Sequence, residues 1–580
     1  MPQERREDLS RLEIRFSPSV AAALVDALPY LAGYAYGCTE QTLNRFLPTL
    51  TVHNTVKELG IDLASLKEKQ TNLNPQELGA PEMRASQWQA SDETAVFDEM
   101  TVAQMARRGL ARILDMQQPD RGWGWFAGSS GGSDPHMTAY VVHDLQKLRA
   151  TGITTDRPFD DDWRLKYGIR WLKKHQRQKT RRLRQANDQV EGKEAHADNV
   201  DAFVFMVLTD EKVEDGDMLE LLYRDRRHLS VYAKAMYGLA LHKLGQTEKL
   251  AMVIRNIEQY LVRDEENDTA YLTLPKRDSW WRWYGNPFEA HAYYLKLLVR
   301  TEPSSAKTAR VAKYLLNNRK NGPRWNSTRD TALCVEALAE FLKASGELTP
   351  DMTVEVSVDN DTLKTQKIST DNLFAFDNAA VLCGKVLSAG DHVVRIQRTG
   401  SGRVYCNAYL TTFTLADSIE PAGSEIKVAR RYFRITKQKR VTTVPDRTGR
   451  PTDREETVER REPLEAPIAL RSGDLIEVEL EISSRNNCEH LTIEDFRAAG
   501  MEPIDSQSGY HGGGIGAFME VKDNRTAFFV RHLRPGTHTL SYRARAEIPG
   551  NYSALPARVY AMYAPELRAN SGEAKIQIAD

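Results

Sequence analysis

The residues with the clearest chemical potential are a cysteine and a glutamine three positions apart, Cys38 and Gln41, in the segment LPYLAGYAYGCTEQTLNRFLPTL. A helix that begins just after Gly37 would place both side chains on one face of its first turn, with Cβ atoms about 5–6 Å apart. A thiolate at a helix N-terminus is electrostatically favoured and reactive. Attack of the Cys38 Sγ on the Gln41 carboxamide, with loss of ammonia, would close an internal thioester.

Holding both groups in one turn supplies the effective molarity that two separate molecules lack. The product is an acyl donor that water or amines destroy, so it needs a dry surround. A C-x-x-Q pair also arises by chance, so the spacing alone leaves two interpretations open: a thioester, or a structural or interaction module in which the ring never forms. Aromatic residues that could supply the dry surround are Tyr30, Tyr34, Tyr36 and Phe46.

The composition is that of a multidomain globular protein. The chain has 580 residues, 41% hydrophobic and 27% charged, which predicts about three to four domains. With 79 basic and 80 acidic residues, net charge gives no argument for nucleic acid or a membrane surface as partner. No stretch approaches 18 apolar residues, so no membrane span is expected. The first ten residues lack the apolar region of a signal peptide. Five cysteines without paired spacing predict neither a disulfide framework nor zinc.

From about residue 18 to residue 346, apolar residues recur every three or four positions, which predicts helices. Several segments end in Gly, a common helix stop. Their starts are similar to one another: a Thr or Glu precedes an Ala-rich stretch, often with Trp or Gly ahead of it. Because one helical hairpin cannot bury its own apolar face, repeated hairpins must stack into a closed ring or an open solenoid. The copies are TAYVV, NVDAFVFMVL, EAHAYYL and DTALCVEAL.

From about residue 348 the apolar period changes to two, with turn sequences between the segments, as in antiparallel sandwiches. The charged stretch Thr436–Glu465 is either a long hairpin or a mobile loop. One strand-like piece, Arg11–Pro18, precedes all the helices, which indicates that the helical domain is inserted into a β-domain that resumes near Met352. Cys383 and Cys406 fall on strands of that β-domain and either pair as a disulfide or stay as two buried thiols.

The sequence around the Cys–Gln pair, YAYGCTEQT followed by RFLP, resembles the thioester motif of the alpha-2-macroglobulin and complement family, its bacterial members above all. In that family the Cys and Gln of a GC-x-EQ segment form the thioester, which maps here to Cys38 and Gln41. Further motifs follow in the family's order along nearly the whole chain: GWGWF, SDPHMTAYV, WWRWYGNP, WNSTRDTA, NLFAFDN, DSQSGY and LPARVYAMYAPELRA.

The resemblance implies a multidomain α plus β fold. An α/α toroid of helical hairpins, the thioester domain, would span residues 18–346. It would be inserted in a CUB-like β-domain made of residues 1–17 and 347–424. Residues 425–580 would form a C-terminal macroglobulin-like β-sandwich of the receptor-binding type. The resemblance also implies an incomplete chain, because family members carry macroglobulin domains and a bait region upstream, and a periplasmic or extracellular location for the intact protein.

The function implied by the resemblance is that of the C-terminal part of a broad-spectrum endopeptidase inhibitor, not an enzyme. Cleavage upstream would release conformational strain and unshield the thioester. Gln41 would then acylate a lysine of the protease and free the Cys38 thiol in a single turnover. The expected partners are target proteases and the upstream macroglobulin and bait-region domains. No nucleic acid is expected, and no cofactor beyond the internal thioester cross-link.

A shield over the thioester is also implied. In bacterial relatives the C-terminal domain is thought to lie against the thioester, with a Tyr just before the motif and a Met near the chain end closing over it. These map to Tyr34 and Met562, with Tyr36 and Tyr563 as neighbouring contributors.

Some family members pass the acyl group to hydroxyls through a His from a later hairpin. The candidates here are His136 in DPHMTAY and His196 in KEAHADN. A surface or capping role suits both better. Without an imidazole relay, free amines are the natural nucleophiles, which favours lysine side chains.

The Trp-rich segments are expected to fill gaps between stacked hairpins, and Cys334 and Cys488 to lie in the core. QQPDRGWGWF is also similar to the Gln-Trp repeats of terpene cyclases, which share an α/α-barrel plan. FDDDW (Phe159–Trp163) has the wrong acid spacing for a cyclase and lies in a turn-like stretch, which disfavours that alternative. The basic run His175–Gln185 is most simply a solvated helix face rather than a nucleic-acid site.

Overall fold

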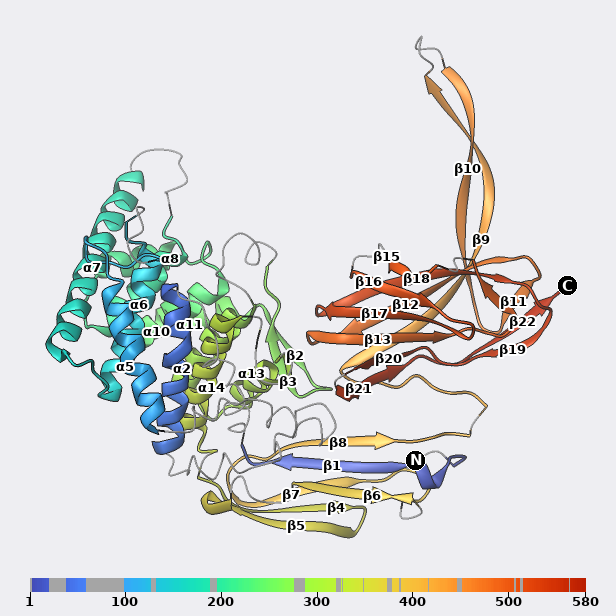
Figure 1. Ribbon diagram of the computed structural model, residues 1–580, viewed down its shortest axis with the longest axis horizontal. Coiled ribbons are helices and arrows are strands. Elements are labelled where there is room, and N and C mark those ends of the chain that lie inside the picture. The colour runs from blue at the N-terminus through green and yellow to red at the C-terminus, as the bar shows by residue number, and fades with distance from the viewer. Residues whose placement is uncertain are drawn as a thin grey trace.

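The computed structural model describes residues 3–19, 38–58, 99–126, 132–187, 196–275, 287–319, 325, 327–347, 349–372, 378–384, 387–415, 417–445, 451–504, 507–511, 515–562 and 564–580. Within them a helical domain is followed by a β-rich domain, with a smaller β-sandwich beside both (Figure 1). The predicted fold class is confirmed. The aromatic residues proposed to surround the thioester that lie outside the described residues are Tyr30, Tyr34, Tyr36 and Tyr563.

Six helices of the described part form a closed inner ring, each packed on the next and the last packed on the first. They are α2 (Thr39–Glu58), α6 (Pro135–Thr151), α8 (Asn199–Asp210), α10 (Val231–Lys243), α12 (Pro287–Thr301) and α14 (Thr328–Ser345). α8, α10 and α12 are buried on nearly all sides, as helices inside a double layer must be. The hairpins therefore stack into a ring and not into an open solenoid.

Outer helices connect successive inner helices and run antiparallel to them. The inner helices therefore run parallel to one another, and their N-termini lie at the same end of the ring. α5 (Glu99–Asp115) packs on α2, α7 (Pro158–Asn187) on α6 and α8, α9 (Gly216–Arg224) on α7 and α8, α11 (Thr247–Glu258) on α10, and α13 (Ala306–Asn317) on α12. The expectation that Phe159–Trp163 lies in a turn was wrong. These residues form the first turns of α7, a 30-residue helix whose buried face packs on its neighbours.

Two tryptophans explain the repeat in the sequence. The Trp123 indole N–H donates to Ile113 O at 2.7 Å, ten residues earlier, and its backbone N–H donates to Thr138 Oγ1 at 2.9 Å. Trp325 repeats the pattern with the carbonyl of Leu315 at 2.9 Å and Thr331 Oγ1 at 3.0 Å. Both rings are fully buried. Each Trp therefore ties the end of an outer helix to the first turns of the next inner helix, which confirms the expected gap-filling role for these two residues.

Replacing Trp325 with Ala is expected to lower the free energy of unfolding of the helical domain by about 3–5 kcal/mol, because it empties a buried site and leaves the Leu315 carbonyl without its donor. Denaturant unfolding followed by helical circular dichroism measures the loss. Trp171→Ala is the matched control, since the Trp171 ring is only half-buried. Equal losses in the two variants would contradict the role of Trp325 as a tie between helices.

The small sandwich combines one strand that precedes the helical ring in the sequence with strands that follow it. In one sheet β1 (Arg11–Ser17) lies between β6 (Ala379–Cys383) and β8 (Tyr405–Thr411), antiparallel to both. In the other, β4 (Asp351–Val358) lies between β5 (Asp361–Ser369) and β7 (Val394–Ser401). Side chains of β1 and β4, such as Ile14 and Val354, share one core. The helical ring is thus inserted between β1 and the remaining strands of this sandwich.

Cys383 and Cys406 lie on the two strands that flank β1, opposite Arg11 and Phe16 respectively. Two strand spacings, about 9–10 Å, separate them across the sheet, before the offset along the strands is counted. That separation exceeds the Cα limit of about 7 Å for a disulfide. Both are free and exposed, so the two alternatives from the sequence, a disulfide or two buried thiols, are both wrong. Cys334 and Cys488 are buried, as predicted.

The C-terminal β-domain, residues 426–580, packs three sheets around one core. In strand order the sheets are β10-β9-β12-β18-β14, β15-β16-β17-β13-β20-β21 and β11-β22-β19. The strands are β9 (Ile426–Pro445), β10 (Pro451–Leu464), β11 (Ile468–Arg471), β12 (Leu475–Ser484), β13 (Cys488–Phe496), β14 (Met501–Pro503), β15 (Gly509–His511), β16 (Ala517–Val521), β17 (Arg525–Leu533), β18 (Gly536–Ala546), β19 (Gly550–Ala554), β20 (Arg558–Ala561), β21 (Ala564–Asn570) and β22 (Ala574–Ala579).

The charged stretch Thr436–Glu465 is a long hairpin. β9 and β10 pair continuously from Tyr432↔Leu464 to Pro445↔Pro451, well past the last residue of β9 that pairs with β12, Ile435. Figure 1 shows this two-stranded ribbon projecting from the β-domain. Of the two alternatives that the sequence left open, the hairpin is correct.

The β-domain contacts the ring at the end where the inner helices begin. The Asn487 backbone N–H donates to Asn318 Oδ1, at the end of α13, at 3.0 Å, and the Asn318 amide donates to Asn486 Oδ1 at 3.1 Å. Arg485 pairs with Asp264. The loop between β12 and β13 is thereby fixed against the outer layer of the ring, beside β2 (Leu261–Asp264) and β3 (Thr269–Leu272) (Figure 1).

A buried histidine joins this short hairpin to the ring. His291 of α12 accepts a hydrogen bond at Nε2 from the Leu272 N–H at 2.8 Å, while Nδ1 lies 2.5 Å from Pro287 O. The imidazole is therefore neutral with its proton on Nδ1. Burial lowers the pKa of His291 from 6.5 to about 4.

Lowering the pH from about 6.5 to about 4 is expected to destabilise the ring, because the unfolded state then binds a proton that His291 in the folded state does not. The sign follows from the depressed pKa: this contribution is complete above the unfolded value and is lost as the pH falls. The expected loss is up to about 3 kcal/mol. Denaturant unfolding across this pH range measures it. His291→Gln should flatten the dependence and the exposed His228→Gln should not; equal pH dependence in all three proteins would contradict the assignment.

Candidate functional site

Cys38 and Gln41 form a reciprocal pair at the start of α2. Cys38 precedes the first helical residue, and its Sγ accepts from the Gln41 backbone N–H at 3.4 Å. In return, the Cys38 backbone N–H lies 3.4 Å from Gln41 Oε1. This is a capping box in which Cys takes the place of Ser or Thr. The geometry brings the thiol and the carboxamide together over a single turn, at the positive end of the helix.

Thr39, the first of the two residues between them, anchors the helix start. The Thr39 N–H donates to Trp125 O at 3.0 Å, and Thr39 Oγ1 donates to Gly124 O at 2.7 Å. Thr39 is fully buried. The GWGWF segment thus has two roles: Trp123 fills the gap between helices, while the carbonyls of Gly124 and Trp125 fix the position of the Cys–Gln turn.

The Cys38 thiol has a raised pKa, whereas the sequence predicted that the helix N-terminus would favour the thiolate. Burial raises its pKa, the hydrogen bond from the Gln41 backbone N–H lowers it in part, and the neighbouring Glu40 carboxylate raises it further. Desolvation of the half-buried sulfur therefore opposes the stabilisation of the thiolate that the helix N-terminus was expected to give.

Sequence reasoning missed a buried ion cluster directly beneath the pair. The Arg329 guanidinium of α14 lies 3.8 Å from Glu40 Oε1 of α2 and pairs closely with Glu289 of α12. Arg329 and Glu289 are buried. Burial is the largest influence on Glu40 and raises its pKa, while Arg329 opposes that shift. The available signal was a charged residue of each sign in the first turns of two Ala- and Leu-rich helices, Glu289 in PFEAHAYY and Arg329 in STRDTALCVEAL.

The same level of the ring holds a second polar tie to α2. Tyr140 of α6 donates its hydroxyl proton to Asn44 Oδ1 at 2.6 Å. Arg329 and Tyr140 therefore connect the first helix of the ring to its two neighbours just below the Cys–Gln turn. The position of the pair depends on ring closure as well as on local helix formation.

The two candidate acyl-transfer histidines lie in different environments. His136 is in the first turn of α6 and buried, with its ring 5.2 Å from Phe203, so the expected surface or capping role was wrong for it. Burial and the nearby Arg329 hold the pKa of His136 well below its ordinary value. His196 is exposed, stacks on His228 with ring centroids 4.0 Å apart, and lies 3.5 Å from Asp225. The surface role expected of His196 agrees with this position.

The two described residues proposed for shielding also differ. Phe46 lies two turns along α2 in the ring core, where its side chain occupies the space that a side chain at Gly109 of α5 would need. Met562 follows β20 and donates its backbone N–H to His490 O at 2.9 Å. Its side chain is 49% exposed. His490 belongs to β13, three residues beyond the Asn487 contact with the ring, so Met562 lies on the part of the β-domain nearest to the ring.

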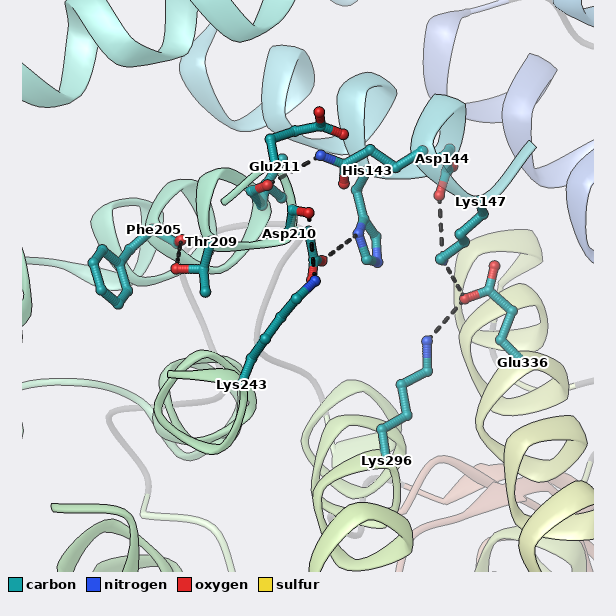
Figure 2. Close-up of polar contacts among 12 residues, drawn as sticks. His143, Asp144, Lys147, Phe205, Thr209, Asp210, Glu211, Lys243, Lys296 and Glu336 are labelled. Atoms are coloured by element: carbon teal, nitrogen blue, oxygen red, sulfur yellow. Dashed lines mark hydrogen bonds and ion pairs between the residues drawn. The ribbon is translucent and has the colours of Figure 1, made fainter. Parts of the chain in front are cut away.

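The opposite end of the ring contains a second charged cluster. Figure 2 shows Lys147 of α6 and Lys296 of α12 converging on Glu336 of α14, at 2.7 and 2.9 Å, with Asp144 beside Lys147. Lys147 and Lys296 line a cavity of about 480 Å³ between the C-terminal halves of the inner helices. Its wall carries carboxylates as well as cations, including Glu340 and the Asp210–Lys243 pair at 2.6 Å. The charges are mutually satisfied, which is the arrangement of a structural lumen.

Metal chemistry finds no support in the described part of the chain, where no group of three His, Cys, Asp or Glu side chains could hold a metal ion. Among the same residues, no helix has both the length and the apolar character to cross a membrane.

Two family models match the chain. The A-macroglobulin TED domain covers residues 16–341, and the bacterial alpha-2-macroglobulin MG10 domain covers residues 426–566.

Proteins similar in sequence to this chain include alpha-2-macroglobulins of two bacteria. An alpha-2-macroglobulin homolog of Nostoc sp. is 22% identical over 511 residues, which is 83% of this chain and 24% of that protein. Alpha-2-macroglobulin of Thermotoga maritima is 23% identical over 333 residues, 57% of this chain and 15% of that protein. The chain thus spans a quarter or less of the length of these relatives. A solved structure of trypsin-activated alpha-2-macroglobulin from Escherichia coli is 18% identical, covering all of this chain and 34% of that one, with a TM-score of 0.46.

Proposed function

The chain belongs to the A-macroglobulin family, and from that premise we propose that it is the conjugating part of a bacterial-type protease trap, with an internal thioester between Cys38 and Gln41. The observation that carries the proposal is the reciprocal Cys38–Gln41 pair at the start of α2. The proposed targets are endopeptidases, which cleave upstream domains of the intact protein and are then bound covalently. A periplasmic or extracellular location belongs to the same proposal.

Ring closure proceeds by attack of the Cys38 Sγ on the Gln41 side-chain carbonyl carbon. The S–C bond forms, the C–N bond breaks, and ammonia leaves with the thiol proton. Negative charge develops on Gln41 Oε1, the atom that faces the Cys38 backbone N–H at the positive end of α2. The capping box thus presents a hydrogen-bond donor to the developing oxyanion while holding the nucleophile in place.

Transfer to a protease reverses the roles of the same atoms. A lysine amine attacks the acyl carbon of Gln41, the new amide bond forms, the C–S bond breaks, and a proton returns to the Cys38 sulfur. Burial that raises the thiol pKa makes Cys38 a poorer leaving group than an exposed cysteine. Relief of that burial on activation accelerates the transfer. His136 is buried in the ring with its pKa depressed, which supports amines rather than hydroxyls as acceptors.

Intact-mass spectrometry of natively purified protein tests the proposal, because thioester closure removes one ammonia, about 17 Da. Denatured protein should expose one thiol fewer than its five cysteines, and methylamine should release that thiol at Cys38. An unmodified mass with Cys38 alkylated from the outset would instead favour a structural or interaction module in which no thioester forms.

The proposed shield is formed by Tyr34 and Met562, with Tyr36 and Tyr563 beside them. Its support is the placement of Met562 directly after β20, bonded to His490 of β13, close to the loop that is fixed to the ring through Asn487 and Asn318. A half-exposed thioether at that place is free to cover an apolar surface contributed by the other domain.

Met562→Ala and Tyr34→Ala are each expected to accelerate spontaneous loss of the thioester at neutral pH by about tenfold or more, because water then reaches the acyl carbon. The rate of thiol appearance measures this, with unchanged thermal unfolding in both variants. Ile548→Ala is the control, since Ile548 is an equally exposed apolar residue of the same domain. Rates that match the control in both variants would contradict the proposed shield without contradicting the proposed thioester.

A further inference from the structure

The outer helix α7 carries a one-signed basic face that the proposed function does not use. Its exposed cations Arg170, Lys174, Arg177 and Arg181 recur every three or four residues and so form one straight stripe, about 16 Å long. Arg182 is exposed beside them. Ion pairs occur at the two ends of the stripe, where Lys166 pairs with Asp162 and Arg184 with Asp217. Between these ends, the described residues provide no carboxylate partner for the stripe cations.

The opposite face of α7 holds the helix rigidly in the folded domain. Leu165, Leu172, Gln176 and Leu183 are buried against the ring. Gln176 Nε2 also donates to Asp215 at 2.8 Å, at the start of α9. The stripe is therefore fixed in place before any partner arrives, and binding would order only the ends of long side chains. Figure 1 shows α7 on the outer side of the ring, away from the C-terminal β-domain.

Aromatic side chains border the stripe. Trp163, Tyr167 and Trp171 follow one another every four residues and are half-buried. Lys166 lies 5.8 Å from the Trp163 ring centroid, and Arg170 lies 5.7 Å from that of Tyr167. Half-buried Trp and Tyr next to Lys and Arg are typical of surfaces that meet the headgroup region of a bilayer.

We propose that the Arg170–Lys174–Arg177–Arg181 face of α7 docks on a membrane surface rich in anionic phospholipid. A flat charged surface meets a straight ridge along its whole length, and each Lys or Arg near such a surface contributes independently. A nucleic-acid duplex fits less well, because a helix reads it by entering a groove about 12 Å wide. The half-buried Trp163, Tyr167 and Trp171 beside the stripe suit the headgroup region of a bilayer better than the walls of a groove.

Co-sedimentation of the whole chain with vesicles of phosphatidylcholine, with and without phosphatidylglycerol, tests the proposal. Binding is expected only with phosphatidylglycerol and should weaken as salt is added. Arg177→Gln with Arg181→Gln should weaken the partition about 30-fold, at about fivefold for each charge. Gln has nearly the helix propensity of Arg, so thermal unfolding should not change.

The matched control removes two exposed charges from the projecting hairpin, Lys437→Gln with Arg440→Gln, and should leave the partition within about twofold. Equal effects of the two double variants, equal binding to neutral vesicles, or binding to a DNA duplex in preference to phosphatidylglycerol would each overturn the proposal.

Discussion

Cys38→Ala and Gln41→Ala are each expected to abolish incorporation of labelled methylamine completely. Each variant removes one of the two atoms between which the proposed acyl bond forms, so no residual reaction through another route is expected. Both should still fold. Thr39 keeps the helix start anchored to Gly124 and Trp125, and losing one side of the capping box costs about 1 kcal/mol.

Cys383→Ala is the matched control, because Cys383 is a free, exposed cysteine remote in sequence from the pair. It should lose one background thiol and incorporate methylamine as the unaltered protein does. Methylamine uptake by Cys38→Ala at the unaltered level would show that the acyl donor had been wrongly assigned.

Arg329→Met is expected to lower the free energy of unfolding of the ring by about 3–5 kcal/mol, because it removes the guanidinium that pairs with the buried Glu289 carboxylate. It also removes the charge that faces Glu40 from α14. Since α14 and α2 close the ring, the effect should extend to the Cys–Gln turn as faster exchange of its amide protons. Denaturant unfolding and hydrogen exchange measure the two effects.

Arg300→Met serves as the control, since it breaks a single, more exposed pair with Glu340 and should cost about 1 kcal/mol or less. Adding Glu289→Gln to Arg329→Met should restore part of the loss, because it neutralises the buried carboxylate that has lost this cation. A double variant no more stable than Arg329→Met alone would show that the guanidinium acts through packing rather than through its charge.

The features that the sequence predicted well are those set by local spacing. The three-residue interval of Cys38 and Gln41 fixes their place in one helical turn, and the capping box confirms that they meet. The Trp before an Ala-rich helix start gave the hairpin repeat because the same two hydrogen bonds recur at Trp123 and Trp325. The alternation of apolar and polar residues identified the β-domains, because successive side chains of a strand point to opposite faces of its sheet.

The features that the sequence did not predict depend on partners far apart in the chain. Arg329 meets Glu289 and Glu40 only because the ring closes, bringing three helices together from separations of 40 and 289 residues (329 − 289 and 329 − 40). The burial of His136 and the raised pKa of Cys38 follow from the same closure, since neighbours from other helices exclude water from both. Cys383 and Cys406 are exposed although Phe16, opposite Cys406 on β1, is buried, because β6 and β8 are the edge strands of their sheet.

The insertion of the ring between β1 and its partner strands determines the order in which the chain can fold. β1 pairs with residues at least 364 positions later in the chain (379 − 15). The entropy cost of closing so long a loop disfavours this pairing while the intervening segment is unstructured. The helices form from local contacts, and once α14 reaches α2 the two ends of the insert lie together. Ring closure then shortens the effective loop to the residues between β1 and α2 and those between α14 and β6. We therefore expect the small sandwich to be completed late, after the ring has closed.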